Sequence, residues 1–125
     1  MDWVIEKHVF GTTIRAQITR LGKDYHILLV GGDQPHIGCT VLAVPRPSLT
    51  GNGQVSCTAS VLNVTGHKDE QICRYLAERI SAKKEAVVVC AGGIHIEKIT
   101  EKQIEEIVDA VREIAVEIVE SERKM

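Results

Sequence analysis

The fold class of this chain is decided by residues 86–96, AVVVCAGGIHI. Ala86 to Ala91 is a run of β-branched and small residues that is too short for a helix, so it predicts a buried strand. Gly92 and Gly93 are expected to end that strand. The segments on both sides show helical spacing of their apolar residues. The sequence therefore predicts one buried strand between two helices.

The two flanking helices are predicted from apolar residues that recur every three or four positions. The first is expected within residues 67–84, with apolar positions at Ile72, Cys73, Leu76, Ala77 and Ile80. The second is expected to open at a capping box, because Thr100 is followed three residues later by Gln103. Its apolar stripe runs from Ile104 to Ile118.

The first half of the chain predicts four strands. They are expected from Phe10 to Leu21, from Tyr25 to Val30, from about Ile37 to Val44 and from Gln54 to Val64. Pro45 to Gly53 is interpreted as an exposed hairpin loop. The predicted order is β-β-β-β-α-β-α in a single α+β domain over residues 1–125. A run of strands followed by α-β-α favours a mainly antiparallel sheet with both helices on one face.

Charge and composition exclude several function classes. The chain has 125 residues, with 15 Lys and Arg against 17 Asp and Glu, a formal net charge of −2. This near-neutral balance argues against nucleic acid or an anionic membrane as the main partner. The aromatic residues make up 3% of the chain and are Trp3, Phe10, Tyr25 and Tyr75. We therefore expect an aliphatic core and no aromatic platform for stacking bases or sugars.

The cysteines and the N-terminal segment indicate the compartment. Cys39, Cys57, Cys73 and Cys90 form no CxxC pair, and we expect them to be reduced core residues. The first ten residues carry several charges and do not resemble a signal peptide. No apolar run has the length of a transmembrane span. The expected location is cytoplasmic.

Three short segments contain more glycine and histidine than packing alone requires. They are residues 31–38 (GGDQPHIG), 65–68 (TGHK) and 92–96 (GGIHI). Glycine lets backbone N–H groups approach a ligand closely. The middle segment precedes the first predicted helix, where free N–H groups and Lys68 would suit a phosphate. Each segment also has a structural interpretation: an irregular turn, a solvated first helical turn and a core histidine, respectively.

The histidines beside these glycines, His36, His67 and His95, leave more than one chemistry open. Three imidazoles could bind zinc, and Asp33 with His36 could form a general acid–base pair. No metal-ligand spacing supports the first idea, and the second is not specific. Nucleophilic catalysis is disfavoured because the chain has no GxSxG motif. We assign no catalytic residue and no metal ligand.

The same three segments resemble the prenylated-flavin chaperone family, the LpdD-like small proteins encoded beside UbiD-type aromatic acid decarboxylases such as gallate decarboxylase. The resemblance covers residues 10–118, and the first and third segments are its specific part. It implies a fold similar to proteasome assembly chaperones, a homodimer, and a role in binding prenylated FMN and supplying it to the apo-decarboxylase. The residues on which it places the cofactor are Gly31, Gly32, Asp33, His36, Gly38, Gly66, His67, Lys68, Gly93 and His95.

Three hypotheses follow for the function. The first is a non-catalytic chaperone that carries prenylated FMN, with a UbiD-type apo-decarboxylase and a second copy of the chain as partners. In an aromatic-poor chain the cofactor would be held by glycine backbone, histidine and a helix N-terminus. The second is an interaction module of the proteasome-assembly-chaperone type without a small ligand. The third is a small metal-dependent enzyme that uses His36, His67 and His95.

Overall fold

The structure is a computed structural model that describes residues 2–64 and 69–121. Within these residues the elements follow the order β-β-β-β-β-α-β-α. The strands are β1 (Asp2–Val9), β2 (Thr12–Leu21), β3 (Asp24–Gly32), β4 (Cys39–Pro47), β5 (Val55–Asn63) and β6 (Val88–His95), and the helices are α1 (Glu70–Lys84) and α2 (Glu101–Ser121).

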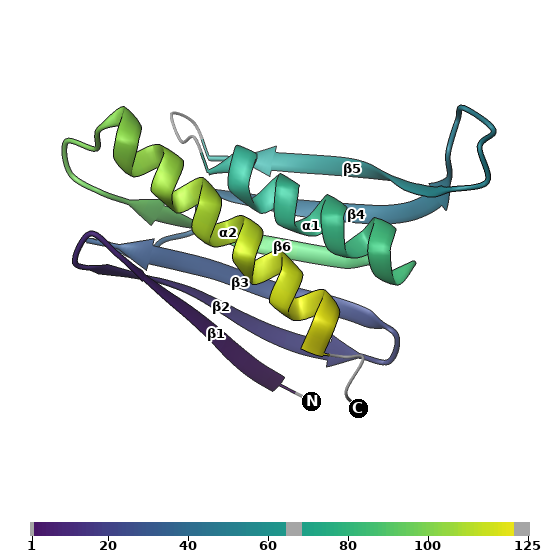
Figure 1. The fold of residues 1–125 in the computed structure, drawn as a ribbon, viewed down its shortest axis with the longest axis horizontal. Helices are drawn as coiled ribbons and strands as arrows, with labels where there is room; N and C mark the ends of the chain where they lie inside the picture. The colour runs from purple at the N-terminus through teal and green to yellow at the C-terminus, as the bar shows by residue number, and fades with distance from the viewer. Residues whose placement is uncertain (1, 65–68, 122–125) are drawn as a thin grey trace.

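The strands form one mixed sheet in the order β1-β2-β3-β6-β4-β5. Every neighbouring pair is antiparallel except β3 and β6, which run parallel at the centre. Both helices lie on the same face of this sheet (Figure 1). Helix α1 packs on β4, β5 and β6, and α2 reaches over β1 and β2. The predicted α+β architecture, with a mainly antiparallel sheet and one helical layer, is confirmed.

Only the second strand of the N-terminal hairpin was predicted from the sequence. Strand β1 pairs with β2 along its whole length, and Phe10 lies in the turn between them, not in a strand as expected. Phe10 and Gly11 both have positive φ angles, 33° and 81°, as the tight two-residue turns of hairpins require. Strand β1 alternates exposed and half-buried residues and contains no fully buried one. Its apolar signal was therefore too weak to predict a strand.

Both glycine doublets lie inside strands, so the prediction that Gly92 and Gly93 end a strand was wrong. In the parallel pair, Gly92 is the partner of Leu29, and the doublet that ends β3 is paired with the end of β6. A Cβ at Gly92 would lie 1.9 Å from the carbonyl oxygen of Leu29, and one at Gly31 would lie 2.4 Å from that of Thr13. The glycines therefore allow the backbones of neighbouring strands to approach closely.

Strand β4 also extends beyond its predicted end. Pro45 and Pro47 belong to β4 and pair with residues of β5. The prediction that they lie in an exposed loop was therefore wrong. The pairing of β4 with β6 stops at Ala43. The prolines, which cannot donate a backbone hydrogen bond, thus occupy the part of β4 that has a neighbour on one side only.

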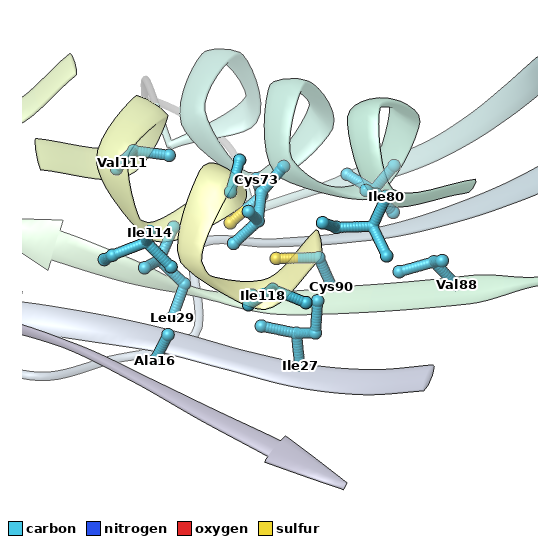
Figure 2. Close-up of a cluster of buried hydrophobic side chains, with 14 of the residues drawn as sticks. Ala16, Ile27, Leu29, Cys73, Ile80, Val88, Cys90, Val111, Ile114 and Ile118 are labelled. Atoms are coloured by element: carbon cyan, nitrogen blue, oxygen red, sulfur yellow. The ribbon is translucent and has the colours of Figure 1, made fainter. Parts of the chain in front are cut away.

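The core lies between the sheet and the two helices and is almost entirely aliphatic (Figure 2). Ile114 and Ile118 of α2 belong to the same buried cluster as Ile27 and Leu29 of β3. The capping box that opens α2 is confirmed. The Thr100 N–H donates to Oε1 of Gln103 at 3.0 Å, and the Gln103 N–H donates to Oγ1 of Thr100 at 3.1 Å. No helix within residues 2–64 and 69–121 is long and apolar enough to cross a bilayer.

All four cysteines are free thiols, and Cys39, Cys73 and Cys90 are buried while Cys57 is half-buried. The hydrogen bond to Cys90 and burial raise the pKa of Cys73, and burial raises the pKa values of Cys39 and Cys57. Since the thiolate is the reactive form, we expect a disulfide reagent at mildly alkaline pH to modify at most Cys57 in the native protein. In concentrated urea all four thiols should react. Rapid titration of four thiols without urea would contradict this packing.

Candidate functional site

The first and third glycine–histidine segments meet at the carboxyl ends of the parallel strands β3 and β6. Gly32 is the partner of His95 in the sheet. The Asp33 N–H donates to the carbonyl oxygen of His95 at 2.7 Å, and Oδ2 of Asp33 accepts the Glu97 N–H at 2.9 Å. The third predicted part, Gly66, His67 and Lys68, lies outside the described residues. The structure therefore brings together two of the three segments.

A pair that the sequence did not predict, His36 and Asp69, lies at this junction. Nε2 of His36 is 3.0 Å from Oδ2 of Asp69, and Oδ1 of Asp69 accepts the Ile94 N–H at 2.8 Å. The backbone carbonyl of Asp69 accepts the Cys73 N–H at 3.1 Å, in the first turn of α1. Asp69 thus ties together the 33–38 loop, strand β6 and the start of α1.

Both ring nitrogens of His36 contact the protein. Nδ1 lies 3.1 Å from the carbonyl oxygen of Gln34, and Nε2 lies 3.0 Å from Oδ2 of Asp69. Only 7% of the Asp69 side chain is exposed, and a buried carboxylate requires such a partner. Asp69 is thus an acidic partner of His36, whereas the Asp33 carboxylate accepts the Glu97 N–H.

Two of the predicted site glycines make room for this pair. A Cβ at Gly38 would lie 2.0 Å from Oδ2 of Asp69, and a Cβ at Gly93 would lie 2.6 Å from Nε2 of His36. Neither distance is compatible with a real side chain. The His36–Asp69 pair thus fills the space beside Gly38 and Gly93. These two positions must be glycine for the pair to fit.

His95 is more accessible than His36. Its ring lies edge-on to the His36 ring, with 6.4 Å between centroids and 81° between planes. About half of its side chain is exposed, and Nε2 lies 3.3 Å from the exposed Glu97 carboxylate. Nδ1 of His95 has no hydrogen-bond partner among the residues that the structure describes. His95 can therefore offer a ring nitrogen to a ligand, whereas both nitrogens of His36 are engaged within the protein.

A pocket of about 520 Å³ opens beside the two histidines. It lies between the end of β6 and the first turns of α1 and α2, and most of its lining is aliphatic. The lining residues are His36, Asp69, Gln71, Ile72, Ile94, His95, Ile96, Ile99, Ile104, Ile107 and Val108. Pockets for small organic ligands typically have this size and combine apolar walls with a few polar groups. Their usual place is the carboxyl end of parallel strands, as here.

The lining suits an organic ligand that has both apolar surface and hydrogen-bonding groups. The polar groups His36, Asp69 and His95 lie close together, and the rest of the lining is mostly isoleucine. For metal binding, no group of three or more His, Cys, Asp or Glu side chains among residues 2–64 and 69–121 is placed to hold an ion. His67, the third histidine of the zinc hypothesis, lies outside those residues.

Asp69 is the site residue that sequence reasoning missed. It directly precedes α1, and aspartate is a favoured residue at a helix N-terminus, so the sequence offered a reason to notice it. Its carboxylate makes no capping hydrogen bond, however. The groups that it binds, in His36 and Ile94, are 33 and 25 residues away along the chain. No local pattern encodes such a pairing.

Comparisons with known proteins bear on the fold and the family of the chain. The chain is similar in structure to one from a crystal structure titled as a novel chaperone complex for yeast 20S proteasome assembly. The TM-score is 0.50 and the identity 7%, with 92% of this chain and 98% of that chain covered, a likeness of fold alone. No curated protein matches the sequence. Residues 8–123 match the family described as prenylated flavin chaperone LpdD-like domain, and the chain therefore belongs to the prenylated flavin chaperone LpdD-like family.

Proposed function

We propose that this protein is a non-catalytic chaperone that binds prenylated FMN in the pocket between β6, α1 and α2. Family membership supports the ligand class. The observation that carries the proposal is the pocket itself, an aliphatic cavity of about 520 Å³ with two histidines on its polar side. The protein would act in the cytoplasm and supply the cofactor to a UbiD-type apo-decarboxylase.

The predicted cofactor residues would have different roles in this proposal. His95 would donate to or accept from the polar edge of the flavin, since Nδ1 has no partner among the described residues. His36 would act through its fixed position beside Asp69. Gly31, Gly32, Asp33, Gly38 and Gly93 would hold the strand ends and the pair in place. Gly66, His67 and Lys68 would bind the phosphate at the start of α1.

Binding is tested by mixing the purified protein with reduced prenylated FMN under anaerobic conditions and recording the absorbance after desalting. We expect a flavin spectrum that stays with the protein. His95→Ala should weaken binding about tenfold, as expected for the loss of one or two hydrogen bonds to a ligand. His8→Ala is the control, because His8 is exposed on β1, away from the pocket. A protein that retains no flavin in this assay is not a carrier of this cofactor.

Delivery is tested separately, because a protein can bind the cofactor without handing it on. An apo-decarboxylase of the UbiD type is incubated with limiting prenylated FMN, with and without the chaperone. We expect a larger active fraction of decarboxylase in its presence and no such gain with His95→Ala. Decarboxylase activity that is the same with and without the chaperone would leave the protein a flavin binder with no role in delivery.

We propose further that the open face of the sheet pairs with a second copy of the chain. The helices cover one face only (Figure 1). On the other face the central strands β3, β6 and β4 carry mostly apolar side chains, which alternate with the buried ones. They are Leu28, Val30, Thr40, Leu42, Val44, Val89 and Ala91, with His26 beside Val89 and Leu62 on the edge strand β5; Leu42, Val44 and Leu62 are at least 40% exposed. A largely apolar patch of this kind suits the self-complementary interface of a twofold dimer.

Sedimentation of the purified protein over a range of concentrations tests this pairing. We expect a dimer, and Leu42→Glu should weaken it at least tenfold because the charge would be buried without a partner. Leu49→Glu serves as the control, since Leu49 is 87% exposed in the loop between β4 and β5. A monomeric wild-type protein would contradict the proposed pairing.

A further inference from the structure

Isoleucines from several elements form an aliphatic wall of the pocket. Ile72 comes from α1, Ile94 from β6 and Ile107 from α2, and Ile107 is only 5% exposed. Ile99 and Ile104 belong to the same lining and are 38% and 39% exposed. The wall thus combines a buried residue with partly exposed ones that a ligand can cover.

The side chains of this wall are branched, and none of them is flat. Isoleucine is stiff at χ1, so its branched surface keeps one shape. Flat rings are commonly gripped by aromatic side chains in offset stacks, but Trp3, Phe10, Tyr25 and Tyr75 are all absent from the pocket lining. The wall therefore offers little to a planar ring system and more to a branched aliphatic group.

We propose that this isoleucine wall is the specificity determinant of the site and selects prenylated FMN over unmodified FMN by enclosing the prenyl-derived carbons. The inference rests on the proposed function and assigns the orientation of the ligand. The aliphatic addition faces Ile99, Ile104 and Ile107, and the polar edge of the flavin faces His95. A prenyl unit adds five carbons that unmodified FMN lacks. Burying about three of them gives a preference of roughly 50-fold.

The experiment compares dissociation constants for prenylated FMN and FMN, both measured anaerobically by fluorescence with the full chain. For the wild type we expect the preference of roughly 50-fold stated above. In the double variant Ile99→Ala, Ile104→Ala the preference should fall below about tenfold, through weaker binding of prenylated FMN and nearly unchanged binding of FMN. Both residues are partly exposed, so their truncation leaves the core intact. The matched control is Val116→Ala, which lies on α2 like Ile104 but outside the pocket lining.

The outcomes separate this inference from the proposed function. Equal affinity of the wild type for the two flavins would overturn the wall as a specificity determinant while leaving flavin binding in place. A double variant that loses affinity for both flavins by the same factor would overturn it as well. If the wild type binds neither flavin, the proposed function fails and the inference fails with it. An effect of Val116→Ala as large as that of the double variant would also count against the wall.

Discussion

Gly92→Ala is expected to destabilise the protein by about 4 kcal/mol, a large part of the 5–15 kcal/mol by which a domain of this kind is typically stable. Two costs contribute. The φ angle of Gly92 is +140°, in a region that L-residues rarely adopt. The new Cβ would also lie 1.9 Å from the carbonyl oxygen of Leu29, and backbone in a central strand cannot move aside as a flexible side chain can.

Urea unfolding followed by Trp3 fluorescence and by far-ultraviolet circular dichroism measures this loss. Gly51→Ala is the matched control, because Gly51 has a φ of +70° but no atom within 4 Å of a Cβ position. It should cost about 1 kcal/mol, the strain of a positive φ alone. The difference between the two variants then reports the close contact of β6 with β3 together with the less favourable φ of Gly92. If both variants lose the same amount, the two strands are not held as closely as the structure shows.

The amphipathic elements were predictable from the sequence because their signals are local. The capping box at Thr100 and the apolar stripe of α2 involve residues within one or two helical turns of each other. Strand β1 was missed because its residues are only half-buried, so its alternation of apolar and polar residues is weak. An amphipathic strand or helix can be predicted from its pattern only where one of its faces is buried deeply enough to require apolar side chains.

The glycine doublets show why the site was harder to predict. A glycine pair has the same sequence signature in a turn as in a strand that must lie close to a neighbour. The choice between the two depends on Thr13 and Leu29, whose carbonyl groups lie next to Gly31 and Gly92. Likewise, the sequence drew attention to His36 but not to Asp69, because only the folded chain brings the two together. Long-range contacts decided both cases.

Asp69→Ala is the second change for which we expect a large effect, a loss of about 3 kcal/mol in the free energy of unfolding. The substitution leaves Nε2 of His36 without its carboxylate partner and the Ile94 N–H without its acceptor. The loss would be larger if both side chains were completely buried. The His36 side chain, however, is 23% exposed, so water can partly replace the lost contact.

Asp69→Asn separates the two contributions. The amide oxygen of asparagine can still accept the Ile94 N–H, and the amide nitrogen can still face Nε2 of His36, but the carboxyl group is lost. We expect this variant to lose about half as much stability as Asp69→Ala. Urea unfolding of both variants beside the wild type measures the two losses. Equal losses would show that the retained hydrogen bond to Ile94 contributes nothing.

A double-mutant cycle with His36→Ala measures the pair itself. The double variant Asp69→Ala, His36→Ala should be more stable than the sum of the single losses predicts, by about 1–2 kcal/mol, because neither group is then left without its partner. Additive losses would contradict a stabilising contact between the two side chains. A positive coupling would make the pair an element that fixes the polar side of the pocket, since Asp69 contacts His36 of the loop, the Ile94 N–H of β6 and the Cys73 N–H of α1.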